Sequence, residues 1–227
     1  VFQHVLSYNK RMIVFDGVIK RFGKRTILDN VNLEIKPGEF ISVIGDSGSG
    51  KTTLIKMILA AEHPSEGKIS VNGRDLRDVR GHELQHYRRN IGVVFQDYKL
   101  IPNKTVFENV AYALEMCDFP LAKILELVPQ ALEMLNLSHL QYQYPNELSG
   151  GDAQRVSLAR AIVHKPNIVL ADEPTGNLDH ENAMQVLKNL IKINLGGVTI
   201  LLTTHNKPLV DLIGQKKVHL RNGKIAV

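Results

Sequence analysis

The sequence predicts an α/β fold with a largely parallel core sheet, an N-terminal antiparallel β subdomain and an inserted helical subdomain. Three observations predict it. Strand-length apolar runs alternate with helical patterns, an early segment alternates apolar and polar residues, and the stretch of about 97–148 shows only helical spacing. We therefore expect a single domain over residues 12–227, with the helical subdomain at about 97–148, and a lead segment of unknown role over residues 1–11.

The N-terminal half is expected to contain several strands and one helix. Val31, Leu33 and Ile35 alternate with polar neighbours, which is typical of a half-buried antiparallel strand. After a turn at residues 37–38, the apolar run 40–44 predicts a buried strand that leads directly into a glycine-rich loop. The other expected elements of this half are an opening strand at about 12–15, a helix at about 52–61, and strands at 68–71 and 91–95.

The stretch of about 97–148 is expected to be helical. Ile124, Leu127 and Ala131 recur at helical spacing, and Pro129 is expected to start or kink a helix. No strong strand pattern occurs in this stretch, so it is interpreted as an insertion into the α/β core.

After Gly151 the alternation of helices and strands returns. Ala183, Val186 and Leu187 mark an amphipathic helix, and Asn222-Gly223 is a hairpin turn signal between two terminal strands. The other expected elements are a helix to about 163, strands at 167–171 and 198–202, and a short helix near residue 208.

The composition is that of an ordinary globular protein, with 44% hydrophobic and 22% charged residues in a chain of 227. The single cysteine, Cys117, permits no internal disulfide and fits a reducing compartment. No apolar run approaches the ~18 residues that span a bilayer, and no signal-peptide pattern is visible at the start. If the protein acts at a membrane, we expect another chain to supply the spans.

The formal net charge is +5, and five arginines lie close together in the sequence, namely Arg74, Arg77, Arg80, Arg88 and Arg89. A solvated basic face is the simplest explanation, and attraction to an anionic membrane leaflet is a sharper alternative. Nucleic-acid binding is not expected, because the chain has no tryptophan and only 6% aromatic residues to stack on bases.

A phosphate-binding loop is the first chemical motif. Residues 45–52 read GDSGSGKT and match the pattern GxxxxGK[ST] between a buried strand and a helix, which is the context that this motif requires. The glycines let successive N–H groups wrap an anion, while Lys51 supplies a cation for the β- and γ-phosphates and Thr52 a hydroxyl for Mg²⁺. The residues expected to bind the nucleotide here are Gly45, Asp46, Ser47, Gly48, Ser49, Gly50, Lys51, Thr52 and Thr53.

Two neighbouring acids end an apolar strand. Asp172 can hold the water shell of Mg²⁺, because this ion prefers hard oxygen ligands and keeps its waters. Glu173 follows directly and can accept a proton from an attacking water. Alone, the pair would indicate only a strand-to-turn transition. Together with the phosphate loop, it predicts a site that hydrolyses a nucleoside triphosphate.

A second glycine-rich turn precedes a helix that is expected from about Asp152. Ser149 is a good N-cap by residue type, so a capped helix start is the simplest explanation. Gly150 and Gly151 are costly there unless something approaches the backbone closely, and a γ-phosphate would explain them. Because a simple kinase or small GTPase needs only one such turn, the second one predicts a nucleotide held between two surfaces.

Three further side chains are candidates for the same site. His205 can contact the γ-phosphate or orient the water, although an isolated histidine is more often structural. Gln96 follows a strand and can touch the metal or the water. Phe22 can stack on adenine, worth ~1–3 kcal/mol by analogy with base stacking, or it can be a core aromatic.

These motifs resemble the ATP-binding-cassette (ABC) ATPases over essentially the whole chain. The matching segments are 45–52 (Walker A), 148–154 (signature), 168–172 (Walker B, followed by Glu173), Gln96 (Q-loop), 177–179 (D-loop, ending in Asp179), His205 (H-loop) and Phe22 (adenine stacking). Asp152, Ala153 and Phe22 depart from the commonest residues of the family but remove no catalytic group.

The resemblance implies ATP and Mg²⁺ as cofactors. It places Thr52, Gln96 and Asp172 around the metal. The catalytic set that it implies is Glu173, His205, Lys51 and Gln96.

Within the family, residues 95–106 and 203–207 resemble ATPases that act in bacterial cell division, whereas DEPTGNLD at 172–179 also occurs in related efflux and lipoprotein-release ATPases. The resemblance implies an FtsX-like integral membrane partner, divisome proteins as further partners, and a peripheral position on the cytoplasmic face of the bacterial inner membrane. The implied output is activation of peptidoglycan hydrolases outside the cell rather than transport.

The implied mechanism pairs two copies head to tail. Each ATP would be held by Lys51 and Thr52 of one chain and covered by Ser149 and Gly151 of the other, with Asp179 at the dimer seam. A groove around residues 98–104 would receive a short cytoplasmic helix of the membrane partner.

Three alternatives remain open. The ATPase could serve a lipoprotein-release, efflux or solute-import complex. It could be a soluble ABC protein acting on ribosomes or DNA, although such proteins commonly carry tandem cassettes or long insertions. It could also bind ATP without turnover, which the presence of Glu173 and His205 argues against.

Overall fold

The computed structural model describes residues 11–226, so the predicted lead segment 1–11 lies outside the described residues except for Arg11. Within this range the strands are β1 (Ile13–Phe22), β2 (Arg25–Ile35), β3 (Phe40–Ile44), β4 (Glu66–Val71), β5 (Arg74–Asp75), β6 (Ile91–Phe95), β7 (Ile168–Asp172), β8 (Thr199–Thr204), β9 (Lys216–Arg221) and β10 (Lys224–Ala226). The helices are α1 (Lys51–Ile58), α2 (His82–Arg88), α3 (Val106–Glu115), α4 (Leu121–Met134), α5 (Gly150–Ile162), α6 (His180–Leu195) and α7 (Lys207–Ile213), with 3₁₀ turns η1 (Ser138–Leu140) and η2 (Pro145–Glu147).

The described strands form a four-stranded sheet in the order β2-β1-β4-β5 and a six-stranded sheet in the order β10-β9-β3-β8-β7-β6. All pairs of the smaller sheet are antiparallel. In the larger sheet only β10 runs antiparallel to its neighbour. The predicted α/β fold, with a largely parallel core and an N-terminal antiparallel part, is therefore confirmed.

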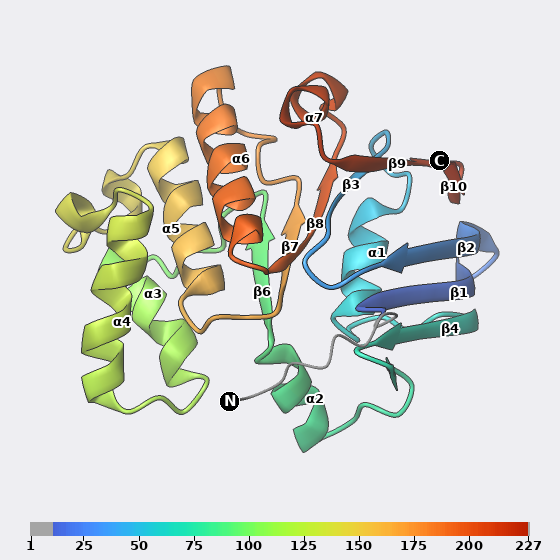
Figure 1. Cartoon of the computed structure of the whole chain (residues 1–227), viewed down its shortest axis with the longest axis horizontal. Coiled ribbons are helices and arrows are strands. Elements are labelled where there is room, and N and C mark those ends of the chain that lie inside the picture. The colour runs from blue at the N-terminus through green and yellow to red at the C-terminus, as the bar shows by residue number, and fades with distance from the viewer. Residues whose placement is uncertain (1–10, 227) are drawn as a thin grey trace, which may run out of the picture.

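The larger sheet separates two hydrophobic cores, because successive side chains of a strand point to opposite faces. In β3, Ile41 and Val43 pack in the core shared with α1 and the antiparallel sheet, whereas Phe40 and Ile44 pack in the core shared with α5, α6 and the helical segment. Figure 1 shows α1 and the antiparallel sheet on one side of the core strands and α5 and α6 on the other.

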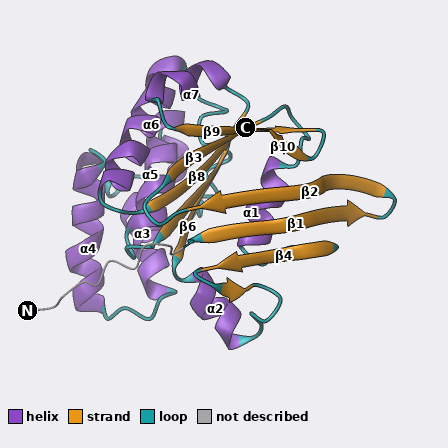
Figure 2. Cartoon of the chain, turned by 45° about the vertical axis from the view of Figure 1, so that its right-hand side comes forward, coloured by secondary structure: helices purple, strands orange, loops and turns teal. Residues whose placement is uncertain are grey.

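The antiparallel sheet is longer than the sequence pattern indicates. Strand β1 continues to Phe22 instead of ending at Phe15. The apolar alternation breaks at Asp16-Gly17, but the strand absorbs this break as a register shift in which Gly17 adopts a positive φ of 57°. The strand therefore extends far enough to carry Phe22 to the end of a hairpin with β2 (Figure 2).

The helical segment contains α3, α4 and the two 3₁₀ turns, with no strand between β6 and β7. Helix α4 begins at Leu121, after Pro120, so Pro129 does not start it, and the alternative expectation that Pro129 kinks a helix stays a prediction. Pro129 lies inside α4, where its ring removes one backbone hydrogen-bond donor.

Helix α2 was not predicted, and it has no buried residue. It carries an arginine of the basic cluster, and three of the five clustered arginines form ion pairs with acids. These pairs are Arg74 with Glu83, Arg77 with Asp75 and Arg89 with Asp118, each at 2.7 Å. This pairing neutralises part of the cluster and favours a solvated face over a surface that attracts an anionic membrane.

Among the described residues, none of the helices combines the length and the apolar character that crossing a bilayer requires.

Candidate nucleotide-binding site

The candidate site lies where three neighbouring parallel strands end. Strand β3 leads into the glycine-rich loop, β7 ends at Asp172, and β8 is followed by His205. This edge of an α/β sheet is where ligands usually bind. A cavity of about 630 Å³ opens here, lined by Phe22, Arg25, Ile27, Asp46, Ser47, Gly48, Gly50, Lys51, Thr52, Thr53, Gln96, Glu173 and His205. All but Arg25 and Ile27 were singled out from the sequence.

Two glycines of the loop are required by its geometry. Gly50 adopts φ 109°, a conformation that L-residues with a side chain rarely adopt, and a Cβ there would lie 2.8 Å from Cδ2 of Leu28. A Cβ on Gly45 would lie 2.5 Å from the backbone oxygen of Leu220. The close packing of this loop against neighbouring segments therefore depends on glycine at both positions.

Lys51 opens α1, and its side chain is only 6% exposed. Its Nζ donates hydrogen bonds to the backbone oxygens of Gly45 at 2.7 Å and Asp46 at 2.9 Å. The same Nζ lies 3.1 Å from Oε1 of Glu173. The ammonium group is thus held at the mouth of the loop, where it can meet an anionic phosphate.

The carboxylate of Glu173 is shared between two partners. One oxygen faces Lys51, while Oε2 accepts a hydrogen bond from the backbone N–H of His205 at 3.2 Å and lies 3.0 Å from its Nδ1. Glu173 also adopts a left-handed backbone conformation, with φ 49°. Such a conformation costs ~1–2 kcal/mol in a residue with a side chain, and strain of this kind clusters at functional sites.

Asp172 is buried at the end of β7, and its Oδ1 accepts a 2.6 Å hydrogen bond from the hydroxyl of Thr203. The backbone N–H of Glu173 donates to the backbone oxygen of Thr203 at 3.0 Å. Thr203 therefore fixes both acids against β8. This role of Thr203 was not predicted, although its place at the end of a buried strand, two residues before His205, is a usable signal.

The residues present fit a magnesium ion that arrives with a nucleotide. Among the described residues, no cluster of three or more His, Cys, Asp or Glu side chains forms a metal-binding group of its own. Mg²⁺ is usually bound through one or two carboxylates together with substrate phosphates and waters. Asp172 supplies a carboxylate, and Thr52 and Gln96 supply a hydroxyl and an amide oxygen.

Gln96 is tied to the segment after β7. Its Nε2 donates to Oδ1 of Asn177 at 3.2 Å, and Nδ2 of Asn177 donates back to the backbone oxygen of Gln96 at 3.3 Å. Gly176 gives this amide room, because a Cβ there would lie 2.9 Å from Nε2 of Gln96. A displacement of Gln96 would therefore also displace the segment that leads to Asp179.

Phe22 sits at the end of the β1–β2 hairpin and is 48% exposed, so it is not a core aromatic. Its strand partner is Arg25, which lines the same cavity. The hairpin places an aromatic face and a cation on one side of the phosphate loop. Arg25 was missed because its strand was expected only from about Val31.

The second glycine-rich turn does not line this cavity. Ser149 is the N-cap of α5, as its residue type indicated, and it accepts a hydrogen bond from the N–H of Asp152 at 3.1 Å. A Cβ on Gly151 would lie 2.1 Å from Oδ1 of Asn182, whose N–H donates to Asp179 at 2.8 Å.

The N-termini of α5 and α6 thus lie together. Asp179 is the N-cap of α6, and the hydrogen bonds from Asn182 hold the pKa of its carboxyl below the usual range. Ser149, Gly150 and Asp179 are all exposed. The second glycine-rich turn and Asp179 therefore lie beside each other, and neither lines the cavity at the phosphate loop of the same chain.

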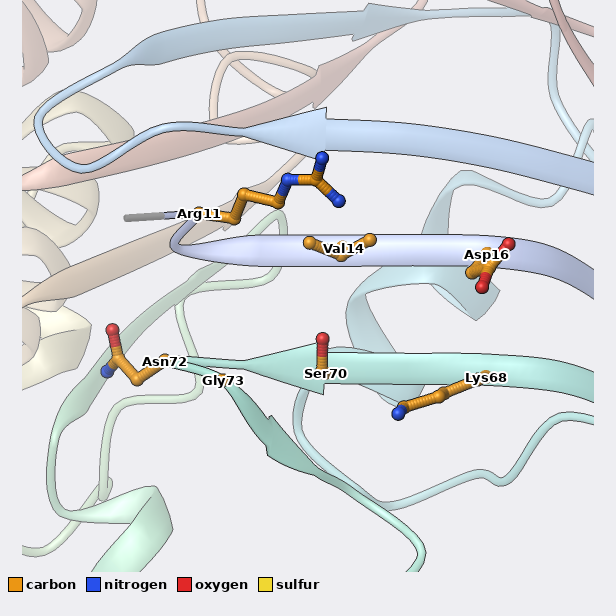
Figure 3. A pocket seen from close by; sticks show the side chains of 7 residues that line it. All are labelled: Arg11, Val14, Asp16, Lys68, Ser70, Asn72 and Gly73. Atoms are coloured by element: carbon orange, nitrogen blue, oxygen red, sulfur yellow. The ribbon is translucent and has the colours of Figure 1, made fainter. Parts of the chain in front are cut away.

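Another hollow, of about 530 Å³, lies on the outer face of the antiparallel sheet. Figure 3 shows its lining residues just before and on β1, on β4 and in the turn after β4, and they are Arg11, Val14, Asp16, Lys68, Ser70, Asn72 and Gly73. None of them is a predicted site residue. The cavity at the glycine-rich loop therefore remains the candidate site.

Comparison with known proteins shows the family of the chain. Residues 28–176 match the ABC transporter family. The chain is 46% identical over 198 residues to the cell division ATP-binding protein FtsE of Bacillus subtilis, covering 87% of each chain. It is also 42% identical over 217 residues to the methionine import ATP-binding protein MetN of Leifsonia xyli subsp. xyli, covering 94% of this chain and 64% of MetN.

A solved structure has the same fold. The ATP-binding cassette MJ0796, described as a dimer in a post-hydrolysis state bound to ADP and Pi, superposes with a TM-score of 0.85 at 34% identity, covering 95% of this chain and 97% of that chain. The chain belongs to the ABC transporter family as one of its ATP-hydrolysing cassettes, and its sequence is similar to the cell division ATP-binding proteins FtsE.

Proposed function

We propose that this chain is the ATPase subunit of a membrane complex of the FtsE–FtsX kind, which drives an FtsX-like protein to control peptidoglycan hydrolysis in bacterial cell division. One observation carries the proposal. The side chains of Lys51, Glu173 and His205 meet in one cavity, in a chain that is 46% identical to an FtsE. Residues 12–227 would act as a single ATPase domain, with 97–148 as its helical subdomain.

In this proposal the loop 45–53 binds the phosphates of ATP and Phe22 stacks on the adenine. Thr52, Gln96 and Asp172 hold Mg²⁺, which would offset the phosphate charge when bound. The ammonium group of Lys51 already donates to backbone oxygens of the loop. Phosphate oxygens would therefore replace other oxygen acceptors around it when ATP binds.

Glu173 is the proposed general base. In the structure its carboxylate is divided between Lys51 and His205. A bound γ-phosphate would draw Lys51 towards itself, because Lys51 lies at the mouth of the loop. Glu173 would then remain bonded to His205 and could accept the proton of the attacking water, a role worth ~10²–10⁴ in rate.

A second copy of the chain would complete each site. Ser149, Gly150 and Asp179 are exposed but do not line their own chain's cavity, so they are available to another molecule. We propose that Ser149, Gly150 and Gly151 of one copy cover the nucleotide of the other, with Asp179 at the seam. ATP would hold the two copies together, and hydrolysis would release them.

The membrane output would use the segment that follows Gln96. We propose that a groove around residues 98–104 receives a short cytoplasmic helix of an FtsX-like protein, so that the ATPase is peripheral on the cytoplasmic face of the inner membrane. The position of Gln96 supports this route, since Gln96 lines the nucleotide cavity and directly precedes that segment. Divisome proteins are proposed as further partners.

Capture from native membranes tests the partner. Glu173→Gln would be loaded with ATP and Mg²⁺, purified gently, and its co-purifying membrane protein identified by mass spectrometry. The proposal expects a four-span protein with a large extracytoplasmic domain and no solute path. The same preparation of Lys51→Ala is the matched control, because it should not hold ATP and should recover less of that protein. A permease with a central solute path would move the function to transport.

Solute import is the second candidate, and the similarity to MetN favours it. Both candidates use the same ATPase chemistry, so turnover cannot separate them. Stimulation of the ATPase by a solute in vesicles that contain the captured partner would support import. A lipoprotein-release or efflux role would show instead as stimulation by a lipoprotein or an exported compound.

A further inference from the structure

Lys20 lies on β1, two residues before Phe22, and does not line the nucleotide cavity. Its side chain is buried in β1, with the residue only 8% exposed. Its Nζ lies 4.7 Å from the centroid of the Phe22 ring, within the range of a cation–π interaction. A buried lysine is uncommon unless its charge is paired, so the groups that pair the charge of Lys20 indicate why a lysine stands there.

Those partners lie just after α1, the helix that begins at the phosphate loop. Nζ of Lys20 donates to Oε2 of Glu62 and to the backbone oxygen of His63, both at 2.8 Å. Glu62 follows α1, and its N–H donates to the backbone oxygen of Lys56 inside that helix at 3.2 Å. The ammonium group therefore connects the aromatic ring of the hairpin to the helix that begins at the phosphate loop.

The same segment holds β1 at two further points. The N–H of Ser65 donates to the backbone oxygen of Ile19 at 2.8 Å, and the N–H of Arg21 donates to Oγ of Ser65 at 3.0 Å. Strand β4 begins at Glu66, opposite Ile19, so the hairpin beyond it extends past β4, as Figure 2 shows. Without these contacts, the end of β1 that carries Phe22 would be held mainly by its pairing with β2.

We propose that Lys20 is a positioning residue that holds the Phe22 ring in place for adenine and fixes its location relative to the phosphate loop. This inference rests on the proposed stacking of Phe22 on ATP. Lys20 contacts the ring, and Phe22 is half exposed and lines the nucleotide cavity, so the ring is held where the base can reach it. A ring that is already fixed loses less freedom when ATP binds, and this preorganisation favours binding.

The test compares two ligands that share the phosphates but differ in the base. Dissociation constants for ATP and for inorganic tripolyphosphate, each with Mg²⁺, would be measured by calorimetry for the wild type, Lys20→Met and Lys20→Arg. We expect Lys20→Met to raise the Kd for ATP about two- to tenfold, as loss of a cation–π contact implies, and to leave the Kd for tripolyphosphate unchanged. Lys20→Arg should restore ATP binding, and KM should rise in Lys20→Met with kcat unaltered.

Two further variants keep the result interpretable. Lys20→Met in a Phe22→Ala background should add no further loss, because no ring is left to position. The double variant Lys20→Met/Glu62→Gln also removes the carboxylate that would lose its partner, so it tests the same expectation if the single variant folds poorly. Binding of tripolyphosphate shows in each case that the phosphate loop is intact.

Each outcome points to a different claim. Equal weakening of ATP and tripolyphosphate by Lys20→Met, or the same loss with and without Phe22, would overturn the positioning role. A Phe22→Ala variant that weakens ATP while Lys20→Met does not would overturn the role of Lys20 alone. A Phe22→Ala variant that binds ATP normally would contradict the proposed adenine stacking and remove the basis of this inference with it.

Discussion

At the scale of single residues, the geometry around Glu173 carries most of the proposed chemistry. Its carboxylate lies between Lys51 at 3.1 Å and Nδ1 of His205 at 3.0 Å, and its backbone has a left-handed conformation. Sequence spacing placed these three residue types in one site. It could not indicate the conformation of Glu173, because a strained φ depends on the surrounding contacts that hold it.

Replacing this carboxylate should separate binding from turnover. Glu173→Gln keeps the side-chain shape but removes the base, so we expect ATP to bind and phosphate release to fall by about 10²- to 10⁴-fold. A phosphate-release assay beside an ATP-binding measurement checks this. Glu181→Gln, an exposed acid in the first turn of α6, is the matched control and should turn over normally. Normal turnover in Glu173→Gln would refute the assignment of the base.

His164 gives a second prediction at this scale, which concerns stability against pH. Burial lowers the pKa of His164 from its usual value of 6.5, and the backbone of Ile91 opposes this shift only in part. The unfolded chain therefore binds a proton at this histidine more readily than the folded chain, and stability is lost as pH falls below the unfolded pKa.

The comparison to make is between the wild type and His164→Leu, with urea unfolding at pH 7.5 and 5.5. The free energy of unfolding of the wild type should fall relative to that of the variant at the lower pH. A difference between the two proteins that stays constant across this range would contradict the prediction.

At the scale of elements, most strands and helices follow from apolar periodicity, and the exceptions have physical reasons. Strand β1 extends beyond its predicted end because Gly17 lets the pairing continue through a shift in register. Helix α2 was not predicted because it is short and only Leu84 and Tyr87, both half-buried, pack against the core. Pro129 lies inside α4, which shows that packing of the apolar face outweighs one missing hydrogen bond.

The segment after Gln96 owes its shape to one buried side chain that sequence patterning did not single out. Asn109 in α3 is fully buried. Its Nδ2 donates to the backbone oxygens of Ile101 at 3.2 Å and Lys104 at 2.9 Å, and its Oδ1 accepts from the N–H of Ile101 at 2.8 Å. The side chain thus fastens the proposed partner groove to the helical segment.

Asn109→Ala should therefore destabilise the protein and loosen this groove. Leaving the buried backbone groups of Ile101 and Lys104 unpaired is expected to cost about 1–3 kcal/mol, measured as a change in the free energy of unfolding by urea. Thr105→Ala, which removes only the N-cap of α3, is the control and should cost about 1 kcal/mol. A cost for Asn109→Ala well below that of Thr105→Ala would show that the Asn109 network contributes little.

At the scale of the whole molecule, the arrangement of sites argues for a pair of chains. The phosphate loop and Glu173 open into one cavity, while Ser149 and Asp179 are exposed away from it at adjoining helix ends. The two glycine-rich turns could be read from the sequence as phosphate-binding. That they do not meet within one chain could be read only from the structure, because it depends on how α5 packs against the core sheet.

The molar mass of Glu173→Gln with and without ATP tests this account most directly. With ATP and Mg²⁺, light scattering should give twice the 25.4 kDa of one chain, and the mass should return to that of one chain with ADP. Ser149→Arg in the same background should keep ATP bound but stay at 25.4 kDa, because the new side chain would block the covering surface. A single-chain mass with ATP demonstrably bound to Glu173→Gln would contradict the composite site and the mechanism built on it.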